Sequence, residues 1–137
     1  MKNAKATVLI LIALISGCVV SPERARADEM YIKAAELRKL SAAVESTVRY
    51  KNPSPTLSDD ELLKLATAAN PALLAVFSGY TLRVDRRDKH AVVLVCTPTG
   101  ETALLEDAAC TGQLDAHHWK ADKPLPCDFT IQAAVVC

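Results

Sequence analysis

The chain has 137 residues, with 16 Lys plus Arg balanced by 16 Asp plus Glu. This length accommodates one compact domain, and the charge balance leaves no basic stripe of the kind that binds nucleic acid. Only two Phe, three Tyr and one Trp are present, so the core has to be built from Leu, Val, Ile and Ala.

The N-terminal residues have the architecture of a secretory signal. Lys2 and Lys5 provide a positive start, residues 6–17 carry no charge, and Cys18 follows a small Ser-Gly pair. This arrangement resembles the lipobox of bacterial lipoproteins, whose cysteine is acylated before the signal is removed. The resemblance implies that Cys18 becomes the first mature residue and carries acyl chains.

The resemblance also implies a destination. Val19, rather than aspartate, follows the cysteine, which in lipoproteins of two-membrane bacteria implies anchoring at the periplasmic face of the outer membrane. A spanning helix is not expected, because it needs about 20 apolar residues and residues 6–20 number 15. Cleavage after Ala27, within Ala25-Arg26-Ala27, remains an alternative and would release a soluble periplasmic form.

We therefore expect three parts: a signal peptide at residues 1–17, a lipidated tether at 18–27, and one globular domain at 28–137. Removing the signal leaves 14 basic and 16 acidic side chains, a slightly acidic mature chain. The predicted fold class is α+β, with two or three N-terminal helices followed by a small antiparallel sheet stapled by two disulfides.

The first helix is predicted to begin near Glu29, with Asp28 as its cap. Charged residues, Glu45 among them, are expected on its solvated face. Asn52-Pro53 ends it, because proline restricts the preceding residue and cannot continue a helix. Apolar residues recur at steps of three and four along it, and the predicted buried stripe is Met30, Ala34, Leu37, Leu40, Val44 and Val48.

The second helix has the clearest local start, because Ser58 and Glu61 have capping-box spacing and Leu57 and Leu62 are placed to form a hydrophobic staple. A short third helix is expected over residues 72–78, with Pro71 at its first position and Gly79 closing it. The predicted buried side of the second helix comprises Leu62, Leu63, Leu65, Ala66 and Ala69.

The hydrophobic period then changes to two. Residues 80–85 alternate as a half-buried strand, residues 86–89 form a polar turn, and residues 90–97 form a denser apolar strand, covered on both faces. After a turn at 97–100, a third strand is predicted from Thr102 to Leu105, although residues 102–110 also have good helix propensity.

The last part of the chain has weaker signals. Residues 113–119 are expected to form one or two helical turns, and residues 122–126 a loop. Phe129, Ile131 and the apolar tail favour a final strand.

With Cys18 acylated or removed, four cysteines remain for two disulfides: Cys96, Cys110, Cys127 and Cys137. Three pairings are possible. A straight strand over 128–136 would hold Cys127 and Cys137 about 33 Å apart, far beyond disulfide reach. Either that strand bends or both cysteines pair with Cys96 and Cys110. A four-thiolate metal site is disfavoured because close Cys-x-x-Cys pairs are absent.

The sequence shows no constellation typical of an enzyme. His117 and His118 are adjacent, so they point to different sides, and a metal site would need Asp115, His90 or Glu106 to approach from elsewhere. Glu106-Asp107, placed in a turn, does not predict the cleft that glycoside hydrolysis requires. A Gly-x-Ser-x-Gly elbow and a phosphate-binding glycine loop are also missing. We expect no enzymatic activity, no metal and no cofactor.

The expected function is that of a non-catalytic lipoprotein, an accessory or assembly factor that binds another envelope protein and no nucleic acid. Candidate contact residues are Asp115, His118 and Trp119 in the loop between Cys110 and Cys127. Alternatively, Trp119 packs against the sheet, or the Ala-rich flank of the first helix binds the partner. An inhibitor or immunity protein of a periplasmic hydrolase is the alternative function, and a metal protein or enzyme using His117, His118 and Asp115 is a third.

Overall fold

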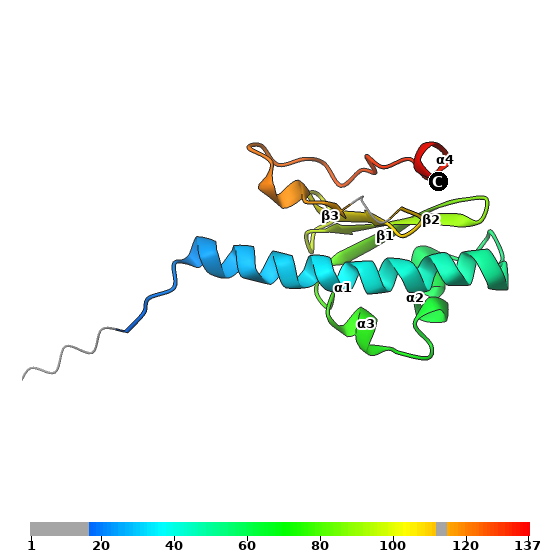
Figure 1. The fold of residues 1–137 in the computed structure, drawn as a ribbon, viewed down its shortest axis with the longest axis horizontal. Coiled ribbons are helices and arrows are strands. Elements are labelled where there is room, and N and C mark those ends of the chain that lie inside the picture. The colour runs from blue at the N-terminus through cyan, green and yellow to red at the C-terminus, as the bar shows by residue number, and fades with distance from the viewer. Residues whose placement is uncertain (1–16, 112–114) are drawn as a thin grey trace, which may run out of the picture.

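The computed structural model describes residues 17–111 and 115–137. A long helix, α1 (Pro22–Lys51), lies along one face of a small antiparallel sheet, and the C-terminal segment lies along the other face (Figure 1). Two short helices, α2 (Asp59–Ala66) and α3 (Ala72–Ala75), pack against α1. The predicted α+β class, with helices first and a disulfide-stapled antiparallel sheet after them, is confirmed.

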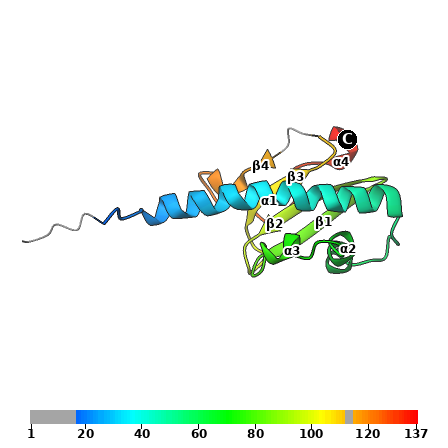
Figure 2. The same ribbon diagram turned by 60° about the horizontal axis from the view of Figure 1, so that its bottom comes forward.

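Helix α1 begins earlier than the sequence pattern predicted. The Ser21 hydroxyl accepts a hydrogen bond from the backbone N–H of Arg24 at 3.3 Å, and Pro22 opens the helix. Serine and proline are the residue types that helix starts prefer at these two positions. The cap assigned to Asp28 was therefore wrong, and residues 22–27 are helical. The first turns of α1 project beyond the sheet (Figure 2).

The buried stripe of α1 is confirmed, because all six predicted side chains are at most 5% exposed. Glu45 departs from the prediction. Its side chain is buried because its carboxylate accepts hydrogen bonds from the backbone N–H of Ala91 and from the ring of His90. The helix ends at Lys51, where Asn52 adopts a left-handed φ of 46°.

The predicted capping box at the start of α2 is present. Ser58 Oγ accepts from the Glu61 N–H at 3.3 Å, and Glu61 Oε2 accepts from the Ser58 N–H at 2.8 Å. Leu62 and Leu63 are buried, but Leu65 is 36% exposed. The helix ends at Ala66, so the buried side is narrower than predicted.

The third helix is confirmed but short, and Pro71 serves as its N-cap. Gly79 follows with a positive φ of 85°, which a glycine adopts without steric cost. This glycine turns the chain into the sheet.

The sheet has the order β1-β2-β3-β4, with all neighbours antiparallel. Its strands are β1 (Thr81–Arg87), β2 (His90–Cys96), β3 (Ala103–Ala108) and the two-residue β4 (Asp115–Ala116). The predicted first and second strands are confirmed, as is a third strand in place of the alternative helix. The polar turn predicted at residues 86–89 is confined to Asp88 and Lys89, because β1 continues through Arg87.

Strand β2 is central and covered on both faces, as its apolar run predicted. Ala91, Val93 and Val95 pack on the α1 side of the sheet. Val92 and Leu94 pack on the opposite side, against the C-terminal segment. The alternation follows from the two-residue period of a strand.

Two predictions about the end of the chain were wrong, and a third was right only in part. Glu106 and Asp107 lie inside β3, not in a turn. Residues 115–120 form β4 and a 3-10 helix, η1 (His118–Lys120), where helical turns were expected; Gln113 and Leu114 lie outside the described residues. The expected final strand is absent from residues 127–137, which instead end in α4 (Ala133–Val136). The backbone N–H groups of Thr130 and Ile131 donate to the Glu106 side chain of β3 instead of to a neighbouring strand.

Candidate functional site

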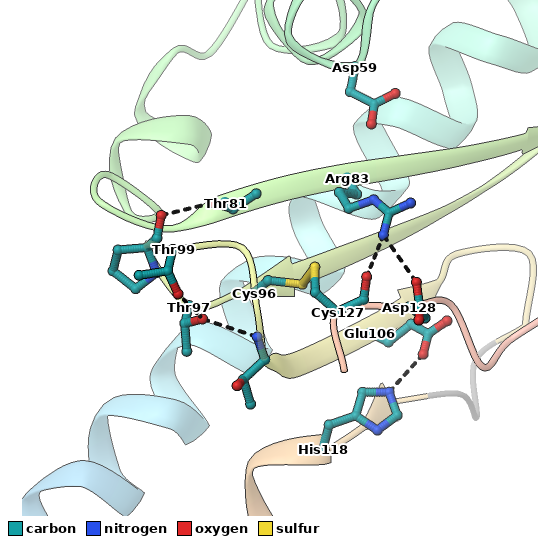
Figure 3. The surroundings of a disulfide bond; sticks show 12 residues. Asp59, Thr81, Arg83, Cys96, Thr97, Thr99, Glu106, His118, Cys127 and Asp128 are labelled. Atoms are coloured by element: carbon teal, nitrogen blue, oxygen red, sulfur yellow. Dashed lines mark hydrogen bonds and ion pairs between the residues drawn. A yellow bond between two sulfur atoms is a disulfide. The ribbon is translucent and has the colours of Figure 1, made fainter. Parts of the chain in front are cut away.

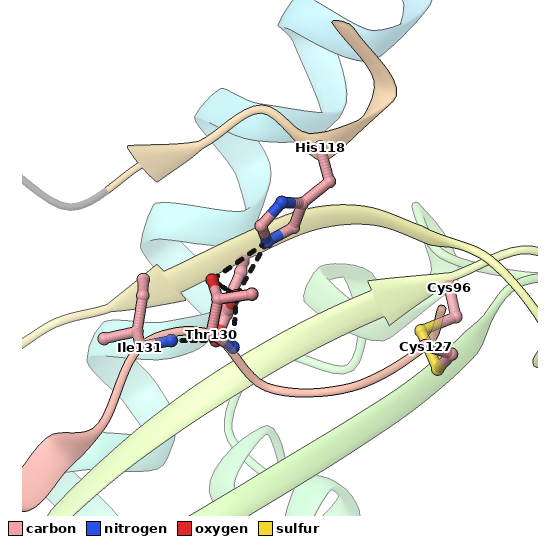
Figure 4. Close-up of polar contacts among 6 residues, drawn as sticks. Cys96, His118, Cys127, Thr130 and Ile131 are labelled. Carbon is pink, nitrogen blue, oxygen red and sulfur yellow. Dashed lines mark hydrogen bonds and ion pairs between the residues drawn. A yellow bond between two sulfur atoms is a disulfide. The ribbon is translucent and has the colours of Figure 1, made fainter. Parts of the chain in front are cut away.

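The carboxylate of Glu106 is the centre of the polar contacts on the C-terminal face of the sheet. Its side chain, on β3, is fully buried. Glu106 Oε1 accepts from the backbone N–H groups of Thr130 at 2.9 Å and Ile131 at 2.8 Å, and Oε2 accepts from Thr130 Oγ1 at 2.7 Å. Nε2 of His118 donates to the same Oε2 at 2.7 Å. The ring and the 130–131 backbone converge from two segments (Figure 4).

These four donors come from η1 and from the C-terminal segment, so one buried side chain holds both of them to the sheet. A buried carboxylate needs such partners, because an unpaired one is expensive to desolvate. Glu106 was among the residues that a metal site at the histidine pair would need to approach it, and Glu106 does approach His118. Glu106 therefore positions η1 and the C-terminal segment on the sheet, and its side chain is buried from solvent.

The two adjacent histidines point to different sides, as predicted. Nδ1 of His117 accepts a hydrogen bond from the indole Nε1 of Trp119 at 3.2 Å, whereas His118 bonds to Glu106. The His117 and Trp119 rings lie 5.7 and 5.6 Å from the ring of Tyr31 on α1. The ammonium of Lys120 lies 4.6 Å from the Tyr31 centroid. We call Tyr31, His117, Trp119 and Lys120 the Tyr31 surface.

The Tyr31 surface is open to solvent in part. Tyr31 is 52% exposed, Lys120 is exposed, and Trp119 and His117 are half-buried. The predicted packing of Trp119 is confirmed, because it lies against the core cluster, and its role in partner contact stays a prediction. Sequence reasoning missed Tyr31, since its proximity to Trp119 depends on how α1 lies over η1.

Of the three predicted contact residues, His118 and Trp119 have different partners, and only the backbone of Asp115 is described. Trp119 belongs to the Tyr31 surface. The ring of His118 is 9% exposed and bonds to Glu106, so it supports the segment instead of facing a partner. Asp115 lies in β4, with its backbone paired to Asp107.

The cysteines pair as Cys96–Cys127 and Cys110–Cys137. This is the second of the two geometric solutions, in which both late cysteines pair with the two earlier ones. Figure 3 shows the Cys96–Cys127 bridge below Arg83, whose guanidinium donates to the Cys127 carbonyl and lies 3.6 Å from the carboxylate of Asp128.

The other disulfide has a histidine beside it. One ring nitrogen of His90 and the sulfurs of Cys110 and Cys137 all lie within 4.8 Å of one another. Nδ1 of His90 lies 2.6 Å from Glu45 Oε1 on α1. Sequence reasoning missed this group, because Glu45 precedes His90 by 45 residues and no local motif links them.

Cys18, the predicted lipidation site, is exposed and lies four positions before the first residue of α1. Within residues 17–111 and 115–137, no helix has the length and apolar character needed to cross a bilayer.

Comparison with protein-family models, curated proteins and solved structures finds no match to this chain.

Proposed function

We propose that the chain is a non-catalytic envelope lipoprotein that binds another envelope protein close to the membrane. The anchor is the acylated Cys18 at the periplasmic face of the outer membrane, and the contact is made by the Tyr31 surface. The observation that carries this proposal is the position of Tyr31, an exposed aromatic residue, on α1, the helix that begins four residues after Cys18.

The length of chain between anchor and helix supports a membrane-proximal contact. Four residue steps join Cys18 to Pro22, which span at most about 14 Å when extended. Nine further residues of α1 place Tyr31 about 14 Å along the helix at 1.5 Å per residue. The Tyr31 surface is thus within about 30 Å of the acyl chains. A flexible ten-residue tether would allow a larger distance.

The composition of the Tyr31 surface supports protein recognition. Tyrosine and tryptophan are enriched among residues that contribute most to binding, because they supply large contact area with few rotatable bonds. Lys120 lies over both the Tyr31 and the Trp119 rings, at 4.6 and 5.4 Å from their centroids. Such a cation stabilises the exposed rings while no partner is bound.

Lipidation supplies the remaining part of the function. Each buried methylene contributes about 0.8 kcal/mol to membrane binding, and more than one acyl chain gives stable anchoring. Anchoring confines the domain to the membrane surface, so a weak contact with a membrane-associated partner becomes effective. The start of α1 at Pro22 supports cleavage before Cys18, because a chain beginning at Asp28 would lose the Ser21 cap and the first helical turns.

The proposal is tested by cross-linking the anchored protein in intact membranes and recovering it with its partner. Tyr31→Ala should reduce the recovered partner at least tenfold. Tyr50→Ala is the matched control, because Tyr50 is 77% exposed on the same helix and lies about 28 Å along the helix axis from Tyr31 at 1.5 Å per residue. Circular dichroism of both variants should match the native chain. Equal recovery with Tyr31→Ala and the native chain would contradict the proposal.

A second measurement separates the accessory role from the inhibitor alternative. Cys18→Ser should leave the domain folded but abolish partner recovery from membranes. Full binding by the untethered variant, together with inhibition of a hydrolase identified as the partner, would support the inhibitor instead. Mass spectrometry of the native mature chain should show an acylated N-terminal Cys18, and an unmodified chain starting at Asp28 would remove the anchor from the proposal.

A further inference from the structure

We propose that His90, Cys110 and Cys137 form a Zn²⁺ site when the Cys110–Cys137 disulfide is reduced. Oxidation and metal binding would then be alternative states of the same two sulfurs. None of these three residues belongs to the Tyr31 surface, and the site does not depend on the proposed function.

The three donor atoms are already gathered by the fold. His90 opens β2, Cys110 follows β3, and Cys137 follows α4, and one donor atom from each lies within 4.8 Å of the others. The α-carbons of the two cysteines are 5.6 Å apart. Two sulfurs bound to one tetrahedral zinc at 2.3 Å each stand about 3.8 Å apart. Rotation about the two Cα–Cβ bonds is enough to open the bonded sulfurs to that separation.

Glu45 holds the imidazole in the orientation that a metal ligand needs. Its Oε1 lies 2.6 Å from Nδ1 of His90, and its Oε2 accepts the backbone N–H of Ala91 at 2.8 Å, so the carboxylate is fixed at both oxygens. Its side chain is only 10% exposed. A carboxylate that binds one ring nitrogen of a metal-ligating histidine is a common second layer of zinc sites, and it leaves Nε2 free to coordinate.

The donor set selects the metal. Two thiolates and an imidazole are preferred ligands of Zn²⁺, which commonly has four of them in a tetrahedral arrangement. Three protein donors leave the fourth position for water or a small external ligand. A pocket of about 350 Å³, lined by His90, Cys137, the end of β1, the β1–β2 turn and α4, lies beside the two ligands and leaves space for such a molecule.

The two disulfides differ in their accessibility to a reductant. Cys96 is 0% exposed and Cys127 is 7% exposed, whereas Cys137 is exposed and Cys110 is half-buried. An external dithiol can therefore attack the Cys110–Cys137 bond while the other bond stays closed. The dithiol gives two electrons and two protons and becomes a disulfide, and Cys110 and Cys137 become thiols. Zinc then displaces both thiol protons.

The test uses the mature chain carrying Cys18→Ser, so that the free Cys18 thiol cannot bind metal. The protein is reduced by a dithiol under native conditions, and thiol alkylation followed by mass spectrometry identifies the opened cysteines. After removal of the reductant, Zn²⁺ is titrated against a chromophoric chelator, and Co²⁺ is added in place of zinc to detect thiolate-to-metal charge transfer. We expect alkylation at Cys110 and Cys137 only, one Zn²⁺ per chain, and no binding by the oxidised protein.

Two variants separate the proposed ligands from general metal adsorption. Glu45→Gln should weaken zinc binding about 10–100-fold, as for other second-layer partners of a ligating histidine. His90→Ala should weaken it further, whereas His117→Ala, in the Tyr31 surface, should leave it unchanged. If a variant fails to fold, the Co²⁺ spectrum of the reduced Cys18→Ser chain, which retains His90 and Glu45, still tests the site. Absence of stoichiometric binding by the reduced chain, equal affinity in His90→Ala, or reduction of Cys96–Cys127 first would each overturn the proposal.

Discussion

Nε2 of His118 donates a hydrogen bond of 2.7 Å to Oε2 of Glu106, and the Glu106 side chain is completely buried. The pair joins η1 to β3, while the other Glu106 contacts hold residues 130–131. Glu106, whose pairing with Asp107 in sequence raises the hypothesis of a catalytic acid, thus organises the tertiary structure of the C-terminal segment.

Glu106→Gln should destabilise the domain by about 3 kcal/mol. The Gln amide keeps one acceptor oxygen, but its NH₂ group then faces N–H and O–H groups that need an acceptor. Urea unfolding followed by circular dichroism measures this change. Glu101→Gln, at an exposed position just before β3, should change the free energy of unfolding by less than about 0.5 kcal/mol. Similar small effects from both substitutions would show that the Glu106 contacts add little to stability.

The two disulfides should contribute unequally to stability. Closing loops of 31 and 27 residues lowers the conformational entropy of the unfolded chain, which raises the free energy of unfolding by about 3.5 kcal/mol in each case. Replacing Cys96 and Cys127 by alanine should cost more than replacing Cys110 and Cys137, because the first pair is also buried and leaves a cavity. The urea midpoints of the two double variants test the order, and a reversed order would contradict it.

The capping box makes stability depend on pH in the acidic range. Hydrogen bonds from the Ser58 backbone and hydroxyl hold the pKa of Glu61 below its ordinary value of 4.5. Because the folded pKa is the lower one, this stabilisation is present above pH 4.5 and is lost as the pH falls through the folded pKa. Glu61→Gln should therefore lower the Tm at pH 7 and have a smaller effect once the pH is below the folded pKa of Glu61.

Asp122→Asn, at an exposed loop position, serves as the control for that pH series. Its Tm should follow the native chain at every pH. A difference between Glu61→Gln and the native chain that stays constant across the acidic range would contradict the proposed origin of the effect.

Tyr80 reports on the contact between α1 and the start of the sheet. Its hydroxyl donates to Glu29 Oε1 at 2.8 Å, and Lys33 lies over its ring at 4.6 Å from the centroid. Burial, and then the hydrogen bond to Glu29, raise the pKa of Tyr80 above 10.0. The raised pKa means that this contribution to stability is present below pH 10 and is lost as the pH rises through the folded pKa.

Glu29→Gln should move the pKa of Tyr80 toward its ordinary value while leaving it above 10.0, because burial remains the larger cause. Ultraviolet titration of tyrosinate, corrected with a Tyr80→Phe variant, isolates this residue from the other two tyrosines. An unchanged Tyr80 titration in Glu29→Gln would contradict the contact.

Local features of the chain were predictable to the extent that their causes lie within a few residues. The Ser58–Glu61 capping box, the buried stripe of α1 and the apolar run of β2 depend on short-range hydrogen bonds or on the period of one element. The missed start of α1 was also local, because Ser21-Pro22 is a stronger start than Asp28. The prediction of a final strand was wrong because the side chain of Glu106 competes with strand pairing for the backbone N–H groups of residues 130–131.

The amino-acid sequence by itself determined the order of elements as far as β3, the class of fold and the presence of four cysteines available for two bridges, since caps, turns and periodicity are set by neighbouring residues. Only the tertiary structure decided which cysteines pair, that Glu45 and Glu106 are buried, and that Tyr31 lies beside Trp119. Those relationships join side chains that are 12 to 88 positions apart in the sequence. No periodic signal links such positions, because the packing of α1, the sheet and the C-terminal segment brings them together.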